Sequence, residues 1–393
     1  MTEKTSLVMF KTQLNTLNHF SDLMKKKFIE LGYEIFDFDC DKPMDELGRL
    51  YAYMQERKVL AMIGFNSNFY SLKTPSGVNV WETLGIYCIN ILVDHPYWYH
   101  NILLETPATG VILTVDRDHM KYVTDYYENV PTVGFLPHGG TSLSDKVKPV
   151  KDRETDLLYV GCYFGESYTE PDLTEYGPVA KKVCESAIRE LIERPEQTIP
   201  EVLKAELLKE NVVMTKEEFR LFMAKCVYIE RVVGSHFREK IIKAFADAGI
   251  NITIYGRNWE KCGIDKYKNV EFKGFVSPEK VIELMNDSKM VLNSMPWFKD
   301  GSHERIYNSM LNGAVPVTET SRYLEETIPE GLAVMFGLSD GEISEGVRRV
   351  KELLKDPAGL QEMSDGCREF ALKGETWEHR AEEIHRDLLM QLI

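Results

Sequence analysis

The chain has 393 residues and a formal net charge of −15 at pH 7. Nucleic acid and anionic membrane surfaces both reward a basic face, so this charge argues against either as the main partner. A content of 44% hydrophobic and 28% charged residues is ordinary for a globular protein. The length exceeds the size at which single cores usually divide, so we expect two domains.

The seven cysteines are scattered through the chain, and no two of them have CxxC spacing. This distribution favours neither a disulfide framework nor a metal site, and it is typical of a reducing compartment. The sequence also has no signal-peptide pattern at its start and no run of 18 uninterrupted apolar residues. We therefore expect a cytoplasmic protein without a transmembrane segment.

Short apolar runs alternate with helical patterns over the first 150 residues. The runs predicted to be buried strands are 6–10, 33–39, 58–65, 88–94, 110–115 and 132–136. Helical patterns lie between them, as at 14–32 and 119–130. Parallel strands joined by crossover helices produce this alternation, so we expect residues 1–150 to form a Rossmann-like domain.

A second alternating block predicts a second Rossmann-like domain over residues 151–376. Its predicted strands begin at "DLLYVG" and continue at 251–256, 270–275, 290–295, 314–319 and 332–337. A mainly helical stretch at about 170–235 is too long for one crossover and is interpreted as an insertion. Residues 377–393 predict a final helix that packs back on the first domain. The predicted fold class is α/β, with two doubly wound domains facing a cleft.

The segment "GSHERIYNSMLNGAVPV" follows one predicted strand of the second block and opens a helix expected from Glu304 to about Asn312. The free N–H groups and the dipole of such a helix start favour an anion such as diphosphate. Arg305 would add a forked, charged donor, and Ser302 is the candidate N-cap. The alternative is that Ser302 is only a cap and that residues 303–305 are solvated charges.

This segment and its flanks resemble the carboxyl-terminal half of glycosyltransferases with the GT-B fold, in the group 1 branch and especially among the CgeB-like spore maturation proteins. The flanking pieces, in chain order, are "LLYVGCYFG", "ITIYGRNW", "VEFKGFVSPEKVIELMNDSKMVLN" and "TWEHRAEEIHRDLL". The resemblance covers most of residues 155–393 apart from the insertion. It is weaker in the amino-terminal half, where "ILVDHP" and "FLPHGG" are recognisable.

The resemblance implies that the second domain binds a nucleotide-diphosphate sugar and needs no other cofactor. It also implies that residues 1–150 form the domain on the acceptor side. It assigns five residues around the helix start to the donor: Ser302, His303, Glu304, Arg305 and Asn308. Many relatives carry two acidic residues eight positions apart, and those positions hold Asp300 and Asn308 here. The acidic pair is only half present, so the resemblance leaves retaining or inverting chemistry open.

Two loops after predicted strands, "YGRNW" and "KGFVS", correspond to family loops that hold the base and the ribose. The donor-contacting residues implied there, with a glycine from an earlier strand end, are Tyr255, Gly256, Phe275, Val276 and Gly161. Glycine permits close backbone approach and aromatic rings offer flat faces. The alternative is that the glycines are turn residues and the aromatic rings, Phe275 above all, belong to the core.

The richest stretch of the first domain is "LVDHPYWYHN", where a strand ends in Asp94 and His95. Sugar transfer needs a base near the acceptor hydroxyl, and these two residues and His138 in "FLPHGG" are the catalytic candidates. Each has a structural alternative. Asp94 would cap the next helix, the aromatic run would pack, and His138 would hold a hinge.

These observations predict a metal-independent glycosyltransferase that moves a hexose from a nucleotide sugar, such as a UDP-sugar, to a protein or glycan acceptor. Two alternatives remain open. One is a sugar-nucleotide epimerase of the same fold. The other is a non-catalytic assembly subunit that binds a sugar nucleotide, or that binds an oligomer partner or a partner enzyme through the helical insertion.

Overall fold

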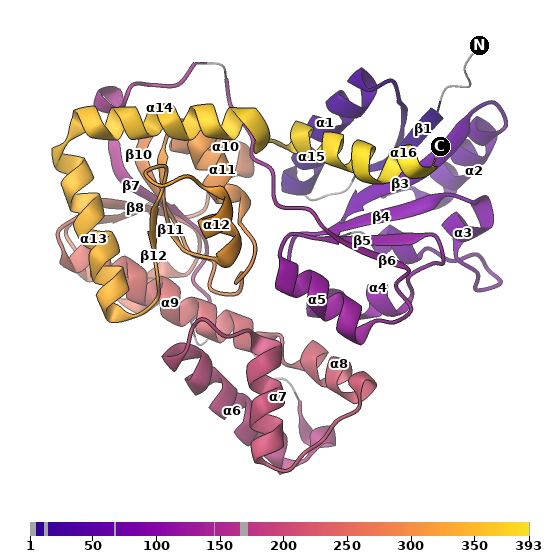
Figure 1. The fold of residues 1–393 in the computed structure, drawn as a ribbon, viewed down its shortest axis with the longest axis horizontal. Coiled ribbons are helices and arrows are strands. Elements are labelled where there is room, and N and C mark those ends of the chain that lie inside the picture. The colour runs from indigo at the N-terminus through magenta and orange to yellow at the C-terminus, as the bar shows by residue number, and fades with distance from the viewer. Residues whose placement is uncertain (1–4, 12–14, 67, 145, 166–171, 393) are drawn as a thin grey trace. The chain divides into compact units, whose positions relative to one another are not determined.

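The computed structural model describes residues 5–11, 15–66, 68–144, 146–165 and 172–392. They form two units, one of residues up to Gly139 together with residues from Glu375 onward, and one of Gly140–Gly374 (Figure 1). The boundary lies 11 residues before the predicted one at 150. Residues just after it already belong to the second unit, because the Thr141 N–H donates to Asn308 Oδ1 at 2.7 Å.

The amino-terminal unit contains a parallel six-stranded sheet in the order β2-β1-β3-β4-β5-β6. The strands are β1 (Thr5–Lys11), β2 (Glu34–Asp39), β3 (Lys58–Phe65), β4 (Tyr87–Leu92), β5 (Gly110–Thr114) and β6 (Thr132–Phe135). Continuous apolar sequences such as "KVLAMIGF" form its central strands, as expected where helices cover both faces. The strand order reverses between β1 and β3, which makes the carboxyl ends of these strands the usual ligand edge.

The helices of this unit come from both ends of the chain. They are α1 (Asn15–Glu30), α2 (Pro43–Met54), α3 (Val80–Leu84), α4 (His100–Leu104), α5 (Arg117–Tyr126), α15 (Trp377–Ile384) and α16 (Met390–Leu392). Helix α15 lies against α1 (Figure 1). Trp377 stacks on Phe20 with ring centroids 4.5 Å apart, and Lys27 Nζ lies 2.9 Å from Glu382 Oε1. The last residues of the chain therefore complete the core of the first unit.

The carboxyl-terminal unit contains a second parallel six-stranded sheet, in the order β12-β11-β10-β7-β8-β9. Its strands are β7 (Thr155–Val160), β8 (Ile252–Tyr255), β9 (Val270–Phe272), β10 (Ser288–Asn293), β11 (Val315–Glu319) and β12 (Val334–Phe336). This is the Rossmann strand order, with its reversal between β7 and β10. The two sheets confirm the predicted α/β class of two doubly wound domains.

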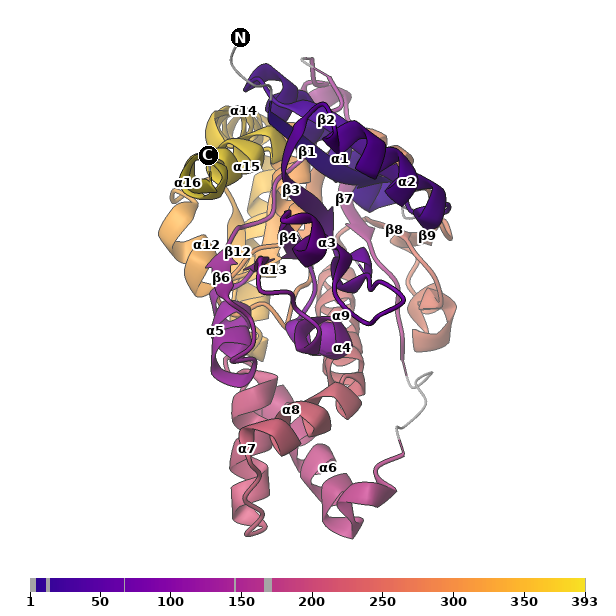
Figure 2. The same ribbon diagram turned by 90° about the vertical axis from the view of Figure 1, so that its right-hand side faces the viewer.

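Between β7 and β8 the described residues include four α-helices. They are α6 (Pro178–Glu193), α7 (Ile199–Lys209), α8 (Lys216–Lys225) and α9 (Tyr228–Asp247). Helices α6, α7 and α8 project from the sheet of their own unit (Figures 1 and 2). The predicted end of the insertion at 235 falls inside the unbroken helix α9, and its predicted start at 170 lies outside the described residues.

The rest of the unit holds α10 (Pro278–Asn286), α11 (Glu304–Leu311), α12 (Arg322–Thr327), α13 (Asp340–Lys355) and α14 (Pro357–Gly374). Helix α14 is absent from the sequence-based expectations, because Pro357, Gly359 and Gly366 weaken its helical signal. Packing stabilises it instead. Its buried face lies against α11, and Ser364 Oγ donates to the Gly313 carbonyl at 2.5 Å. None of the described helices is both long and apolar enough to cross a membrane.

We expect Trp377→Ala to destabilise the amino-terminal unit by about 3–5 kcal/mol, because it removes a fully buried indole from the Phe20 and Phe65 contacts. Denaturant unfolding followed by circular dichroism measures the change. Tyr51→Ala is the control, since this aromatic ring on α2 is 63% exposed and its loss should shift stability by less than about 0.5 kcal/mol. Equal stability of the two variants would contradict the core role of Trp377.

Candidate functional site

Helix α11 begins at Glu304, after β10 and a ten-residue loop. Its N-cap is His303, in extended conformation, and His303 Nδ1 accepts the Arg305 N–H at 3.2 Å. The prediction that Ser302 caps the helix is therefore wrong, because the first helical residue directly follows His303. Burial lowers the pKa of His303, which suits a neutral ring that accepts this hydrogen bond, although Glu304 opposes the shift.

The Arg305 guanidinium is half-buried and has a neutral partner. It donates to Asn293 Oδ1 at the end of β10, and Asn293 Nδ2 donates to Thr318 Oγ1 on β11 at 2.9 Å. Within the described part of the chain no carboxylate lies within ion-pair distance of this guanidinium. Burial lowers the pKa of Arg305, since desolvation disfavours its charge. A partly desolvated cation with no carboxylate in direct contact favours an incoming anion.

A second arginine, Arg238 on α9, belongs to the same cluster. Its Nη1 donates to the Cys162 carbonyl just after β7 at 2.9 Å, and its guanidinium carbon lies 5.0 Å from the Trp297 ring centroid. It too has no carboxylate partner among the residues described. The pKa of Arg305 is lowered first by burial and further by the charge of Arg238, so the two guanidinium groups share one electrostatic environment.

Glycines bring three strand ends of this unit close together. The Gly161 N–H after β7 donates to the Tyr255 carbonyl at 2.9 Å, and the Gly256 N–H after β8 donates to the Gly274 carbonyl at 2.8 Å. Gly256 has φ +155°, and a Cβ there would lie 2.0 Å from the Gly161 carbonyl oxygen. Only glycine fits at this crossing, so the backbones of Gly161 and Gly256 approach each other closely just after the carboxyl ends of β7 and β8.

The aromatic candidates after β8 and β9 have different environments. Phe275 is 63% exposed, and the Arg257 guanidinium lies 4.6 Å from its ring centroid, so the alternative that Phe275 belongs to the core is wrong. Tyr255 is half-buried and packs against a small apolar cluster that contains Leu158. Val276 is also half-buried. Among these three side chains, Phe275 is thus the one with an exposed aromatic ring.

Asn308 and Asp300, the two positions of the family's acidic pair, are both engaged. The buried Asn308 side chain accepts the Thr141 N–H, as described above, while Asp300 Oδ2 lies 3.3 Å from Arg322 Nη2. Asn312, one turn after Asn308, accepts the Leu143 N–H at 2.9 Å. The two asparagines therefore fix the first residues of the unit along α11.

In the amino-terminal unit, Asp94 follows β4 and its carboxylate is exposed. Asp94 Oδ2 accepts hydrogen bonds from Tyr99 Oη at 2.7 Å and from Asn66 Nδ2 at 3.1 Å. The short 3₁₀ helix that follows is capped by His95, whose Nδ1 accepts the Tyr97 N–H at 3.3 Å, so the alternative of Asp94 as the cap is wrong. Asp94 is an oriented and accessible carboxylate.

The two histidine candidates of this unit are buried. The His95 ring stacks on Tyr97 at 3.8 Å between centroids, and burial together with nearby His119 holds the pKa of His95 well below its usual value. His138 packs edge-on against Trp377, and its carbonyl accepts from the Arg380 guanidinium at 3.0 and 3.1 Å. Both imidazoles are embedded in the packing of the unit.

The site also contains residues that the sequence-based reasoning missed. Arg238, Asn293 and Glu319 all lie near Arg305, as hydrogen bonds and pKa effects indicate. Asn293 and Glu319 are the last residues of β10 and β11, so a polar residue at a strand end was the available signal. Arg238 lies within a helix, and only tertiary structure reveals its place.

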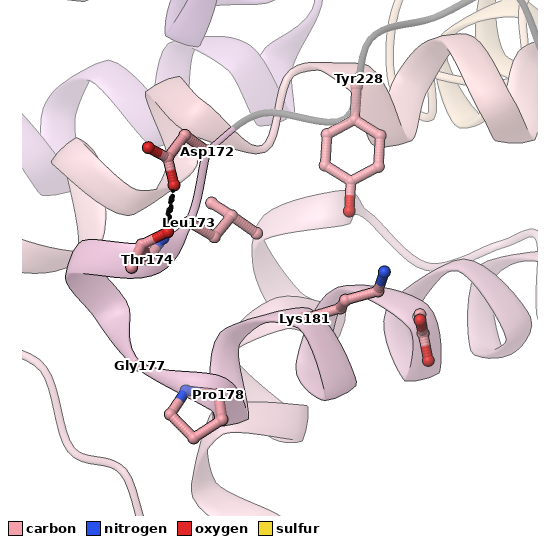
Figure 3. A pocket seen from close by; sticks show the side chains of 8 residues that line it. Asp172, Leu173, Thr174, Gly177, Pro178, Lys181 and Tyr228 are labelled. Atoms are coloured by element: carbon pink, nitrogen blue, oxygen red, sulfur yellow. Dashed lines mark hydrogen bonds between the residues drawn. The ribbon is translucent and has the colours of Figure 1, made fainter.

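A pocket of about 450 Å³ lies elsewhere in the unit, in the helical insertion. It is lined by Asp172, Leu173, Thr174, Gly177, Pro178, Lys181, Glu185 and Tyr228 (Figure 3). Its lining offers two carboxylates and one ammonium group, and Asp172 already accepts the Thr174 N–H at 2.9 Å. This charge balance disfavours a diphosphate, so the candidate site lies at the ends of β7 and β10, which Arg238 and Arg305 contact.

The buried His95 predicts a pH dependence of stability. Its pKa is depressed in the folded state, so below about pH 6.5 the unfolded chain takes up a proton that the folded chain does not. Stability should therefore fall with pH in this range, by up to about 1.4 kcal/mol per pH unit from this residue. His95→Asn keeps a cap acceptor and should flatten the loss measured by denaturant unfolding between pH 6.5 and 5. The same change at exposed His19 should not, and an unchanged slope in His95→Asn would contradict the assignment.

Comparisons with known proteins concern the fold of the chain and the family of one segment. Residues 236–386 match a family model described as glycosyl transferase-like. A search of curated proteins gives no significant match. Sucrose-phosphate synthase from Thermosynechococcus elongatus has a TM-score of 0.56 at 11% identity, with 99% of both chains covered.

Two further solved structures have the same architecture. Anabaena HepE, determined with UDP and glucose, gives a TM-score of 0.52 at 10% identity, over 97% of this chain and 98% of that one. AviGT4, a glycosyltransferase of avilamycin A biosynthesis, gives 0.50 at 15% identity over 99% and 98%. Identities this low establish a shared fold rather than a shared activity. The chain has the GT-B fold of glycosyltransferases, and its residues 236–386 match the glycosyl transferase-like family.

Proposed function

We propose that the protein is a glycosyltransferase that moves a sugar from a nucleotide-diphosphate sugar to an acceptor. The observation that carries this proposal is the pair Arg238 and Arg305, neither of which has a carboxylate partner among the described residues. Both belong to the segment that matches the glycosyl transferase-like family. They accompany the strands where a Rossmann order reverses, which is the usual place for a nucleotide.

The proposed reaction breaks the bond between the anomeric carbon and a phosphate oxygen, and negative charge grows on the departing diphosphate. Arg305, Arg238 and the positive end of the α11 dipole would stabilise this charge. Glu304 would lie beside the donor. In this scheme two guanidinium groups neutralise the diphosphate, and no metal is required. The stereochemical outcome depends on the donor and acceptor geometry.

For the acceptor we propose Asp94 as the group that receives the hydroxyl proton. Its carboxylate is exposed and is oriented by Tyr99 and Asn66, whereas His95 and His138 are buried in packing contacts. An accessible carboxylate at a strand end suits general-base catalysis better than a buried imidazole. His95 and His138 then support the amino-terminal unit.

For the donor we propose that the base stacks on exposed Phe275, with the backbone of Gly256 and Val276 close to the nucleoside. A UDP-sugar is the first candidate, because HepE has the same fold and was determined with UDP and glucose. The CgeB-like resemblance favours hexose transfer to a bacterial surface protein or glycan. The seven free cysteines support a location in the reducing cytoplasm.

Binding and turnover assays separate this proposal from its alternatives. Nucleoside diphosphates and their sugars are first screened by thermal shift, and the best donors are then incubated with and without cell-surface protein or glycan. Transfer to the acceptor supports the proposal. Conversion of the donor into an isomeric sugar nucleotide without acceptor indicates an epimerase, and binding without turnover indicates a non-catalytic subunit. Failure of every nucleoside diphosphate to bind refutes the proposal.

Arg305→Ala should weaken nucleoside diphosphate binding about 10- to 100-fold, since a charged hydrogen bond contributes about 1.5–3 kcal/mol. Titration calorimetry measures the affinity, and a thermal melt checks the fold. Arg348→Ala is the control, because the exposed Arg348 guanidinium already contacts Glu345 and Glu352. Unchanged affinity in Arg305→Ala would refute the assigned role.

Asn293→Asp tests the same site: it keeps the oxygen that accepts from Arg305 but loses the donor to Thr318 Oγ1. The new carboxylate would pair with Arg305 and compete with the phosphate, so affinity should fall about tenfold or more while thermal stability holds or rises. Asn293→Ala removes the neutral partner without adding charge and should reduce affinity less. Tighter diphosphate binding by the Asp variant would contradict an uncompensated arginine as the anion ligand.

A further inference from the structure

Glu319, the last residue of β11, is a buried carboxyl group beside the arginine cluster. It is 3% exposed. Its Oε1 accepts from Ser294 Oγ at 2.8 Å, and its Oε2 accepts the Met295 N–H at 3.2 Å. Ser294 and Met295 are the first two residues after β10, so Glu319 fixes the start of the loop that leads to His303 and Arg305.

Glu319 has no ion-pair partner within the described residues, although it interacts electrostatically with three cations. They are Lys299 of the loop, Arg238 of α9 and Arg305 of α11. Burial raises the pKa of Glu319 to about 7, against the opposing effects of the Ser294 hydrogen bond, Lys299, the Met295 N–H and Arg238. Close to neutral pH this carboxyl group can therefore be either protonated or ionised.

The other two acids near Arg305 have different surroundings. Asp300 pairs with Arg322 from α12, whereas the half-buried Glu304 interacts electrostatically with Arg305. The ionised Glu319 is thus, beside Glu304, a buried negative charge that offsets part of the positive charge of Arg238 and Arg305. These two arginines are also the diphosphate ligands of the proposed function.

We propose that Glu319 is a positioning residue of the donor site that takes up one proton when the donor diphosphate binds. This inference rests on the proposed function. A bound diphosphate satisfies both arginines and leaves a second negative charge buried nearby, which is costly in a low-dielectric environment. A proton from solvent then neutralises Glu319. Its new O–H donates to Ser294 Oγ, while the other oxygen still accepts the Met295 N–H, so the loop stays fixed.

Proton uptake makes donor affinity depend on pH in a defined direction. Binding that takes up a proton is favoured at low pH, so affinity should fall as pH rises through neutrality, by up to about tenfold per pH unit. The probe is UDP-glucose, whose phosphates are fully ionised in this range. UDP itself is unsuitable, because a terminal phosphate titrates near about pH 6.

Titration calorimetry with UDP-glucose at pH 6, 7 and 8, in two buffers of different ionisation enthalpy, counts the protons directly. We expect uptake approaching one proton in the wild type at pH 8. Glu319→Gln should bind UDP-glucose without uptake and with a flat pH profile, and a thermal melt checks its fold. Glu325→Gln, at an exposed acid on α12, is the matched control and should behave like the wild type.

A second variant covers the case in which Glu319→Gln does not fold. Ser294→Ala removes one donor to the Glu319 carboxylate, so the fall in affinity should move to higher pH. Binding without proton uptake, or uptake that persists in Glu319→Gln, overturns this inference alone. If UDP-glucose fails to bind, the calorimetry is repeated with any donor found in the screen. If no nucleotide sugar binds, the proposed function falls and this inference falls with it.

Discussion

The hydrogen bond between Arg305 and Asn293 is the interaction on which the candidate site depends. On the surface of α13, by contrast, the carboxylates of Glu345 and Glu352 neutralise Arg348. At the end of β10 the partner is a neutral amide, which leaves the charge of Arg305 available. Thr318 fixes the orientation of the Asn293 amide, because Thr318 Oγ1 accepts a hydrogen bond from Asn293 Nδ2. The Arg305 side chain is thus held in place by a hydrogen bond while no carboxylate among the described residues forms an ion pair with its guanidinium.

Parallel strand geometry explains why so few residues suffice. All strands of a doubly wound sheet end at one edge, so consecutive crossovers deliver Asn293 and Glu319 to the same neighbourhood from distant parts of the sequence. The amino-terminal, positive end of helix α11 lies at these strand ends. Helix α9 contributes Arg238, which donates to the Cys162 carbonyl just after β7. Charge and backbone donors converge through topology alone, and the long insertion before α9 does not disturb them.

Much of this arrangement is readable from the sequence, within physical limits. Alternating apolar runs predicted both sheets, and the polar helix start drew attention to Glu304 and Arg305. The cap was misassigned because capping depends on the angle at which the loop enters the helix, which residue types do not specify. For Phe275 the sequence left a donor-facing and a core position open, since exposure is a tertiary property. Arg238 could not be found, because its contacts span distant segments.

The return of the chain to its first unit has a consequence for how the protein is made. Trp377 fills the core between Phe20 and Phe65, so the amino-terminal unit lacks a central side chain until residues 375–393 have been synthesised. The contiguous unit of residues 140–374 has no such dependence. During translation, therefore, the second unit can complete its core while the first waits, reversing the usual amino-to-carboxyl order of domain folding.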